Sequence, residues 1–561
     1  MAKKSKYAEW TKEELIKRVE ALEKRKKYGL VWDEERTKEK FDTEAEGKLP
    51  VLKEIKSKEI KTDPDKPTHI LIEGDNYHAL SVLNYTHEKA VDVIYIDPPY
   101  NTGAKDWKYN NNYVDENDPY RHSKWLSMMY KRLKLAKKLL APRGVLICTI
   151  DENEHATVGM LIREMFLLKE IVCVTIVHNP GGIQGKNFSY CHEYAYFVYP
   201  KNGRCINLEE RDENPDVRPL RNVSKGEHLR ETAANCFYPI YIKDGKIVGF
   251  GEVCDDSFHP GTANILGKNG IIEVYPIDSQ GNERKWVFAR QTVESIKDEL
   301  SVEFNKKRQI WDIIRKKTKF NYKTVWTDPK FNANLFGTQL LNNIVETKFP
   351  FPKSLYAVEE CIKAVIHSKE NAVVLDFFAG SGTTGHAVSK MNKQDGGNRQ
   401  FILCTNNEEN ICNDVTYPRI KKIIKGYIGI VDNKNHKGLN GNLKYYRTSF
   451  VPSEPTDRNK ERLTKEATDM LCLRENTFEF VLETGTFKIF KNKEHYTGII
   501  FDQLSIPKFK KAVAKFEKKI SVYVFSLGDD DFSDEFEDMR SRVRVCSIPE
   551  AILRVYRRIF K

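Results

Sequence analysis

The residues with the clearest capacity for chemistry lie in the stretch VDVIYIDPPY, residues 91–100. Six mostly β-forming residues lead directly into Asp97, Pro98, Pro99 and Tyr100. One proline would be enough to end a strand, because proline lacks the backbone N–H that a sheet uses. A carboxylate, a rigid backbone and an aromatic ring therefore stand together at a strand end, where parallel α/β sheets build their binding sites.

These groups suit the methylation of an exocyclic amino group, whose nitrogen is a poor nucleophile because its lone pair is delocalised into the ring. The Asp97 carboxylate would accept one N–H, and the Pro98 carbonyl, held by the rigidity of proline, would accept the other. The ring of Tyr100 would stack on a base that has been turned out of the duplex. The alternative is an ordinary strand-end turn in which Asp97 acts as a cap.

A second strand end, in VVLDFFAGSGTTGHAV, carries Gly380, Gly382 and Gly385 in the G-x-G-x-x-G spacing at a helix start. A dinucleotide dehydrogenase, a methyltransferase and a tight turn without ligand all fit this spacing. Asp376 and Phe378 precede the first glycine, whereas a dehydrogenase strand usually runs directly into its glycines. The next strand, QFILCTNNEEN, ends in acids that suit a ribose hydroxyl contact. The loop therefore predicts an adenosine-type cofactor and leaves its identity open.

DPPY and FAGSG together resemble the amino-group DNA methyltransferases that depend on S-adenosylmethionine. DPPY is typical of adenine-N6 enzymes, whereas cytosine-N4 members more often carry serine in place of the aspartate. The catalytic motif precedes the cofactor motif, an order that resembles the β class of this family, in which the segment between them is the target-recognition domain. The stretches TNNEENIC and DVTYPRI, the motif layout and the C-terminal part are similar to the modification (Mod) subunits of type III restriction-modification systems.

The resemblance implies a site for S-adenosylmethionine, and the absence of a C-x-x-C pair leaves no metal site to expect. The GDN stretch at 74–76 would contact the cofactor adenine, with Asp75 on its amine and Asn76 in the same turn. FPFPKSL would place Lys353 near the methionine carboxylate, and Phe378 would lie beside the positively charged sulfonium. Glu408 would take the ribose hydroxyls, with Glu409 as the alternative. The remaining expected contacts of the loop are Asp376, Gly380, Ser381, Gly382 and Thr383.

Several other stretches support two interpretations. Tyr109 and Tyr113, in an Asn-rich segment over 101–120 that is expected to be a surface loop, would either clamp the flipped base or simply lie at the surface. HEY at 192–194 resembles a family motif near the base pocket, or it begins a structural strand. The basic helix at 121–138 would track phosphates or present a solvated face.

Alternating strands and helices predict an α/β fold with a Rossmann-like S-adenosylmethionine-dependent methyltransferase sheet. The capping box from Thr11 to Glu14 predicts a short amphipathic helix that packs on the body or contacts a partner. The predicted divisions are an N-terminal helix and extended arm at 1–66, the catalytic half of the methyltransferase domain at 67–203, an inserted target-recognition domain at 204–329, the cofactor half at 330–452 and a small C-terminal α/β domain at 453–561.

The composition of the 561 residues, 40% hydrophobic, excludes wholesale disorder. The net charge of +12 permits a polyanionic partner without requiring one. The 11 cysteines include no C-x-x-C pair, which indicates free thiols in a reducing compartment. No signal peptide and no long apolar run are found, so a cytoplasmic protein without membrane contact is expected.

Together these patterns predict a sequence-specific DNA adenine-N6 methyltransferase, the modification subunit of a type III system. Its expected partners are double-stranded DNA, a second copy in a homodimer, and a separate restriction (helicase–nuclease) subunit, because the chain carries no G-x-x-x-x-G-K-[ST] motif. The dimer is an expectation from the resemblance. The alternatives are a cytosine-N4 DNA methyltransferase, an RNA or protein-glutamine methyltransferase, and a catalytically silent DNA-binding specificity subunit for a nuclease.

Overall fold

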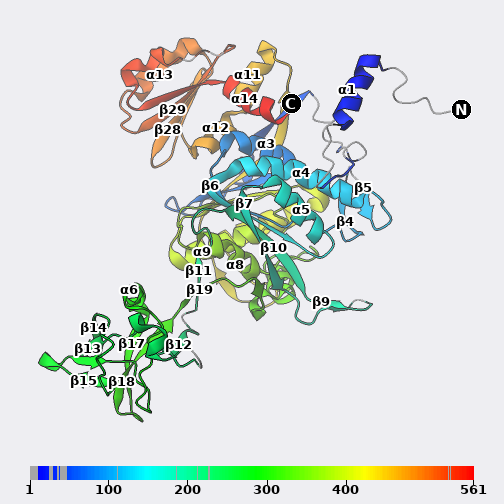
Figure 1. Cartoon of the computed structure of the whole chain (residues 1–561). Coiled ribbons are helices and arrows are strands. Elements are labelled where there is room, and N and C mark those ends of the chain that lie inside the picture. Colours follow the sequence, from blue (N-terminus) through cyan, green and yellow to red (C-terminus); the bar gives the residue numbers. More distant parts are fainter. Residues whose placement is uncertain are drawn as a thin grey trace. The chain divides into compact units, whose positions relative to one another are not determined.

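The chain forms two compact units, Met1–Asn207 with Lys323–Lys561, and Leu208–Tyr322 (Figure 1). The first unit contains both strand-end motifs. The computed structural model describes residues 10–23, 30–33, 37, 39, 47–109, 112–184, 186–211, 213–224, 228–528, 530 and 532–560.

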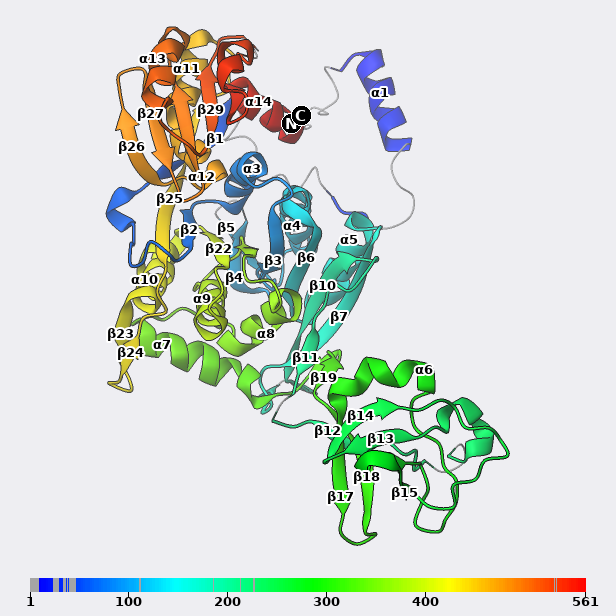
Figure 2. The same cartoon turned by 90° about the vertical axis from the view of Figure 1, so that its left-hand side faces the viewer.

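A ten-stranded mixed sheet forms the centre of the first unit (Figure 2). Its six strands from β25 to β6 are parallel, whereas β1 and β10 run antiparallel to their neighbours. The predicted α/β fold class is confirmed by this sheet. In spatial order the strands are β1 (Lys48–Glu54), β25 (Asn442–Pro452), β2 (Thr68–Glu73), β22 (Gln400–Thr405), β21 (Val373–Asp376), β3 (Val91–Ile96), β6 (Leu140–Ile150), β10 (His192–Pro200), β7 (Lys169–Val177) and β20 (Val325–Trp326).

Helices cover both faces of this sheet (Figure 1). One group consists of α3 (Asn76–Thr86), α4 (Arg121–Leu139) and α5 (His155–Met165), and the other of α7 (Leu340–Ile344), α8 (Leu355–Ile366), α9 (Thr383–Asp395) and α10 (Tyr417–Lys425). Because both faces are covered, the central strands are apolar almost throughout, and Val93, Ile94 and Ile96 of β3 are fully buried.

The N-terminal segment differs from the expected packed helix and extended arm. Helix α1 (Lys12–Glu23) begins with the predicted capping box, in which Glu14 accepts a 2.7 Å hydrogen bond from the Thr11 N–H. Among its described side chains, Leu15 and Val19 are 40% and 52% exposed and are not covered by the body. Within the segment expected to be an arm, β1 pairs with β25 and extends the main sheet by one edge strand.

The Asn-rich stretch expected to be a loop contains a hairpin of β4 (Ala104–Tyr109) and β5 (Asn112–Asp115). The pairing joins Lys108 to Tyr113, so cross-strand contacts outweigh the weak strand propensity of the asparagines. Other short pairs are β8 (Ile183–Gln184) with β9 (Ser189–Tyr190) and β23 (Gly426–Ile428) with β24 (Asn435–Lys437).

The C-terminal part forms a small second sheet in the first unit. Its strands are β26 (Glu479–Glu483), β27 (Phe487–Lys491), β28 (His495–Ile500), β29 (Lys519–Phe525) and β30 (Val543–Ile548), and its helices are α11 (Asp457–Glu466), α12 (Thr468–Glu475), α13 (Ile506–Val513) and α14 (Glu550–Ile559). Side chains of α11, α12 and α14 belong to the same apolar core as the main sheet. This shared core explains why the C-terminal part is not a separate compact unit.

The second unit, Leu208–Tyr322, is built of short strands around its own core, which includes Tyr238 and Trp286. Its bounds fall inside the segment 204–329, where the sequence loses its α/β alternation. The elements are β11 (Leu208–Glu210), β12 (Asp216–Pro219), β13 (Ile240–Lys243), β14 (Lys246–Phe250), β15 (Asn264–Leu266), β16 (Ile272–Val274), α6 (Arg290–Val293), β17 (Leu300–Asn305), β18 (Ile310–Lys317) and β19 (Lys319–Asn321).

All 11 cysteines are free thiols. Among the helices in the described ranges, none is both long and apolar enough to cross a membrane.

The basic helix α4 directs one of its cations into the protein. The Arg132 side chain is 5% exposed and donates a hydrogen bond to Glu39 Oε1 over 2.9 Å and another to Asp75 Oδ2 over 3.2 Å. Its Nε also donates to the side-chain oxygen of Asn76. The interpretation of α4 as one face of solvated or phosphate-binding cations is therefore wrong for Arg132, which links the N-terminal segment to the GDN turn.

We expect Arg132→Met to lower the free energy of unfolding by about 3 kcal/mol, because the buried Glu39 carboxylate would lose its guanidinium partner at 2.9 Å and keep only the ammonium of Lys131 at 3.6 Å. Urea denaturation measures this change. Lys134→Met is the matched control on the exposed side of the same helix, and it should cost less than about 0.5 kcal/mol. Equal effects of the two substitutions would contradict a structural role for Arg132.

Candidate active site

The two chemical motifs lie at neighbouring strand ends. Strands β3 and β21 pair in parallel, with Val93 opposite Val374 and Ile94 opposite Leu375. The chain leaves β3 at Asp97 and leaves β21 after Asp376, so both loops start at the same edge of the sheet. This is the carboxyl edge, where α/β proteins bind their ligands.

The carboxylate of Asp97 is held in place from the next strand. Thr149 of β6 donates its hydroxyl to Asp97 Oδ1 over 2.8 Å and lies 3.2 Å from the Ile96 carbonyl. Trp125 Nε1 donates to the Pro99 carbonyl over 2.7 Å. No described residue donates to the Pro98 carbonyl, which leaves it available as an acceptor for a ligand.

Lys353 lies against the DPPY motif. Its ammonium is 3.0 Å from Asp97 Oδ2 and 3.3 Å from Glu193 Oε2, and it stands 4.4 Å from the centre of the Tyr100 ring. Burial alone would lower the pKa of Lys353, but the two carboxylates outweigh it and raise that pKa above its ordinary value. The resemblance had suggested a position at the methionine carboxylate, whereas here the ammonium is already paired with two acids.

Glu193 lies in the HEY stretch but is not among the individual residues that the sequence predicted for the site. It is 3% exposed at the start of β10, where it accepts a 2.9 Å hydrogen bond from the Tyr100 hydroxyl. Burial would raise the pKa of Glu193, but the charge of Lys353 lowers it below its usual value. A signal was present in HEYAYF, because Glu193 shares a sheet face with the buried Ala195 and Phe197. An acid at such a position needs a buried partner.

The glycine loop after β21 is fixed by Asp376. Its Oδ1 accepts a 2.9 Å hydrogen bond from the Phe378 N–H, and its Oδ2 accepts a 2.6 Å hydrogen bond from the Thr384 hydroxyl. Burial raises the pKa of Asp376 to about 7, and among the described residues no cation forms an ion pair with it. The loop thus contains a buried acid without a counter-ion, which fits a cationic ligand group.

Two different structural constraints require glycine in this loop. Gly380 and Gly382 have φ of +47° and +81°, in the left-handed region that favours glycine. A Cβ at Gly385 would lie 2.7 Å from Ile420 Cδ1 and 3.0 Å from Leu403 Cδ1, so the third glycine permits close packing of α9. The spacing G-x-G-x-x-G is therefore used for a tight turn and for close packing of the following helix.

The GDN turn is tied to the same loop. Asn76 donates its side-chain N–H to the Phe377 carbonyl over 2.9 Å. Asp75 caps α3 by accepting the Tyr77 N–H at 2.8 Å, and its other oxygen binds Arg132. The turn that is expected to meet the cofactor adenine is thus held between α4 and the glycine loop.

The two candidate acids for the ribose differ in their surroundings. Glu409 accepts a 2.5 Å hydrogen bond from the Tyr113 hydroxyl and lies 3.5 Å from the ammonium of Lys108, both in the β4–β5 hairpin. Glu408 is exposed beside them. Because Glu409 already has these partners, Glu408 is the acid that remains for a ligand. Tyr113, a candidate clamp for the flipped base, contacts Glu409 instead. The side chain of Tyr109 lies outside the described residues.

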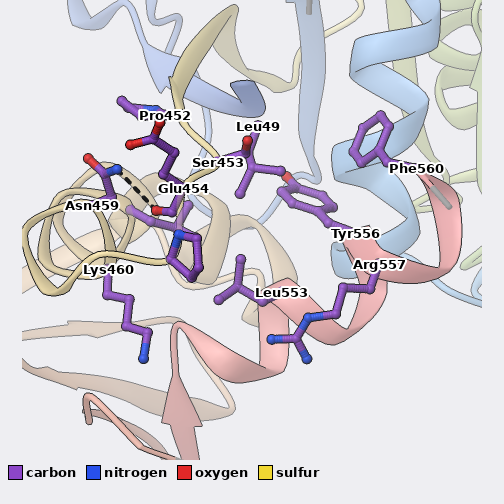
Figure 3. A pocket seen from close by; sticks show the side chains of 12 residues that line it. Leu49, Pro452, Ser453, Glu454, Asn459, Lys460, Leu553, Tyr556, Arg557 and Phe560 are labelled. Carbon is purple, nitrogen blue, oxygen red and sulfur yellow. Dashed lines mark hydrogen bonds between the residues drawn. The ribbon is translucent and has the colours of Figure 1, made fainter. Parts of the chain in front are cut away.

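A separate pocket lies between the C-terminal helices and the edge of the main sheet (Figure 3). The apolar side chains of Leu49, Leu553 and Tyr556 line it, and so do the basic side chains of Lys460 and Arg557. It includes no residue of the strand-end site.

The arrangement at the two strand ends defines a class of protein. The N6/N4 DNA methylase family profile matches residues 91–437, more than half of the chain and a span that includes both motifs. The chain belongs to this DNA methylase family. It is a DNA methyltransferase, and its methyl donor is S-adenosylmethionine.

Individual relatives include a type II methyltransferase and type III Mod subunits. The type II methyltransferase M.KpnI of Klebsiella pneumoniae is 30% identical over 354 residues, which cover 60% of this chain and 79% of that protein. The StyLTI Mod subunit of Salmonella typhimurium, a type III restriction-modification enzyme, is 29% identical over 433 residues, 70% of this chain and 62% of the subunit. The EcoPI Mod subunit of Escherichia phage P1, also type III, is 27% identical over 407 residues, 64% of this chain and 60% of the subunit. The matches therefore span less than two thirds of these two Mod subunits.

A solved structure of a DNA modification methylase from Thermus thermophilus, complexed with S-adenosyl-L-methionine, also matches. It is 13% identical with a TM-score of 0.30, and the match covers 67% of this chain and 99% of that chain.

The buried Asp376 makes stability depend on pH. Its pKa is about 7 in the folded protein against an ordinary value of 3.8, so between these values the folded protein binds a proton that the unfolded chain does not. Stability should therefore fall as pH rises from 4 to 7, by up to about 1.4 kcal/mol per pH unit. Asp376→Asn lacks this component, so denaturation should show the variant gaining on the wild type between pH 5 and pH 8. A difference independent of pH would contradict the expectation.

Proposed function

We propose that this protein transfers a methyl group from S-adenosylmethionine to the N6 amine of adenine in double-stranded DNA, in a sequence-specific manner. The observation that carries the proposal is the pairing of β3 with β21, since it brings the Asp97 carboxylate beside the glycine loop. The aspartate at the first position of DPPY supports adenine over cytosine as the target base, because cytosine-N4 enzymes more often carry serine at that position.

S-adenosylmethionine supplies a methyl group made electrophilic by its sulfonium. Asp97 Oδ2 and the Pro98 carbonyl accept the two N–H groups of the adenine amine, which draws the nitrogen toward a geometry with an exposed lone pair. Thr149 keeps the carboxylate in one orientation through Oδ1. After the transfer the amine carries an extra proton, and Asp97 is the base in contact with it.

Glu193 and Lys353 contact the residues that would bind the adenine, namely Tyr100 and Asp97. Glu193 holds the Tyr100 ring by its hydroxyl, so that the ring is oriented to stack on the flipped adenine. Lys353 occupies Asp97 Oδ2 with an N–H donor, which is the kind of group that the adenine amine presents. When the amine binds at that oxygen, Lys353 keeps Glu193 as its counter-ion.

We further propose that the protein acts as the modification subunit of a type III restriction-modification system. The similarity to the StyLTI and EcoPI Mod subunits supports this assignment. In this proposal the unit Leu208–Tyr322 reads the DNA sequence, two copies form a homodimer, and DNA cleavage belongs to a separate restriction subunit.

We expect Asp97→Asn to reduce methyl transfer by about 100-fold or more, because the amide cannot accept the N–H and the proton as a carboxylate does. Tritiated methyl transfer to duplex DNA measures the rate, and mass spectrometry of the digested DNA identifies the base. Asp92→Asn is the matched control, since Asp92 lies at the opposite end of the same strand and binds Lys369 and the Val373 N–H. It should retain transfer.

Three results would contradict the proposal at different levels. Methylated cytosine would overturn the adenine assignment. A wild type without transfer would favour a DNA-binding specificity subunit, and full activity of Asp97→Asn would remove Asp97 from the mechanism.

Sequencing the methylated bases in DNA from a host that expresses this chain would identify the recognition site. With a duplex that contains this site, light scattering should give a mass that corresponds to two protein chains on one duplex. A single chain on specific DNA would contradict the homodimer.

A further inference from the structure

Arg419 of α10 is a fully buried cation without an acid. Its Nη1 donates to Thr383 Oγ1 over 2.9 Å and to Ser381 Oγ over 3.0 Å, and it lies 3.4 Å from the Ser381 carbonyl. Its Nη2 lies 3.4 Å from His386 Nδ1, and its Nε has no hydrogen-bond partner. Across the described part of the chain, no carboxylate forms an ion pair with this guanidinium.

Such a charge is costly to bury, and the protein pairs its comparable cations. Arg132 binds Glu39 and Asp75, and Lys353 lies between Asp97 and Glu193. Burial lowers the pKa of Arg419 to about 10, so the guanidinium is still charged at neutral pH. The structure alone gains little from an unpaired buried cation, and an anion that joins it during function would offset the cost of its burial.

The hydroxyls beside Arg419 indicate where that anion would bind. A hydroxyl has one hydrogen, and the oxygens of Ser381 and Thr383 already accept from Arg419. The two oxygens lie 3.2 Å apart, so one hydrogen can be shared between them and the other must be donated elsewhere. Both residues flank Gly382 at the N-terminus of the 13-residue helix α9, where the helix dipole also favours negative charge.

We propose that Arg419 is the positioning residue for the methionine carboxylate of S-adenosylmethionine. The guanidinium orients the hydroxyls of Ser381 and Thr383 as donors to that carboxylate and supplies the buried counter-charge. This inference rests on the proposed cofactor site. It differs from the expectation that Lys353 has this role, because the ammonium of Lys353 is neutralised by two acids.

The zwitterionic methionine moiety suits two buried groups near this loop, Arg419 of α10 and Asp376. It has a carboxylate for the side of Arg419 and cationic groups for the buried Asp376, which has no cation of its own in the described structure. A ligand that carries both signs would satisfy the two groups together.

The test compares S-adenosylmethionine with its decarboxylated analogue by titration calorimetry. The wild type should bind S-adenosylmethionine about 10- to 100-fold more tightly, the range expected for charge-assisted hydrogen bonds. In Arg419→Met this preference should fall below about 3-fold, while binding of the decarboxylated analogue changes little. Thr383→Val, which keeps the shape and removes the hydroxyl, should shift the preference in the same direction.

Two further variants separate charge, position and folding. Lys353→Met should keep the wild-type preference for S-adenosylmethionine over the decarboxylated analogue. If Lys353→Met loses this preference, Lys353 is the residue that binds the methionine carboxylate, and the proposal is overturned. Arg419→Lys keeps a cation that can reach a hydroxyl, and it should retain part of the preference. If Arg419→Met does not fold, Thr383→Val and Ser381→Ala provide the same comparison.

Two outcomes for the main comparison would be decisive against the inference. Equal weakening of both ligands in Arg419→Met, or a wild type without preference, would leave Arg419 as a purely structural residue. A wild type that binds neither ligand would instead overturn the proposed cofactor site itself.

Discussion

The parallel pairing of β3 with β21 is the contact on which the rest of the site depends. It joins segments about 280 residues apart and aligns Val93 with Val374, so that the loops after both strands open at one edge. A shift of this register by one residue would turn every side chain of a strand to the other face of the sheet. All residues of the two strands except Asp92 and Val373 are buried, between helices on each side, which makes such a shift costly.

The catalytic and cofactor motifs differ in whether their buried ionisable groups are paired. Around the DPPY motif, Asp97 and Glu193 are both paired with Lys353 within the protein. In the cofactor half, Asp376 and Arg419 are buried without a partner of opposite charge among the described residues. This contrast matches the proposed ligands, because an adenine base is neutral and the methionine part of S-adenosylmethionine carries charges of both signs.

Elements that depend on a short segment of chain follow their sequence patterns. The capping box of α1 and the strands around both motifs follow the patterns of short segments. The hairpin β4–β5 and the edge strand β1 were not predicted, since pairing with a second strand stabilises them more than their own composition does. The basic residues of α4 looked equivalent in sequence, yet Arg132 is buried while Lys134 is exposed.

The sequence by itself determined which groups stand at the strand ends, because Asp97 and the prolines directly follow β3, and Gly380 and Gly382 supply the left-handed backbone of their own turn. It also determined the α/β class, which follows from the alternation of strands and helices. Only the tertiary structure decided the partners of Lys353, Glu193 and Arg419. In each of those contacts the two residues are far apart in the sequence. The arrangement of strands and helices around the sheet decides which of them meet.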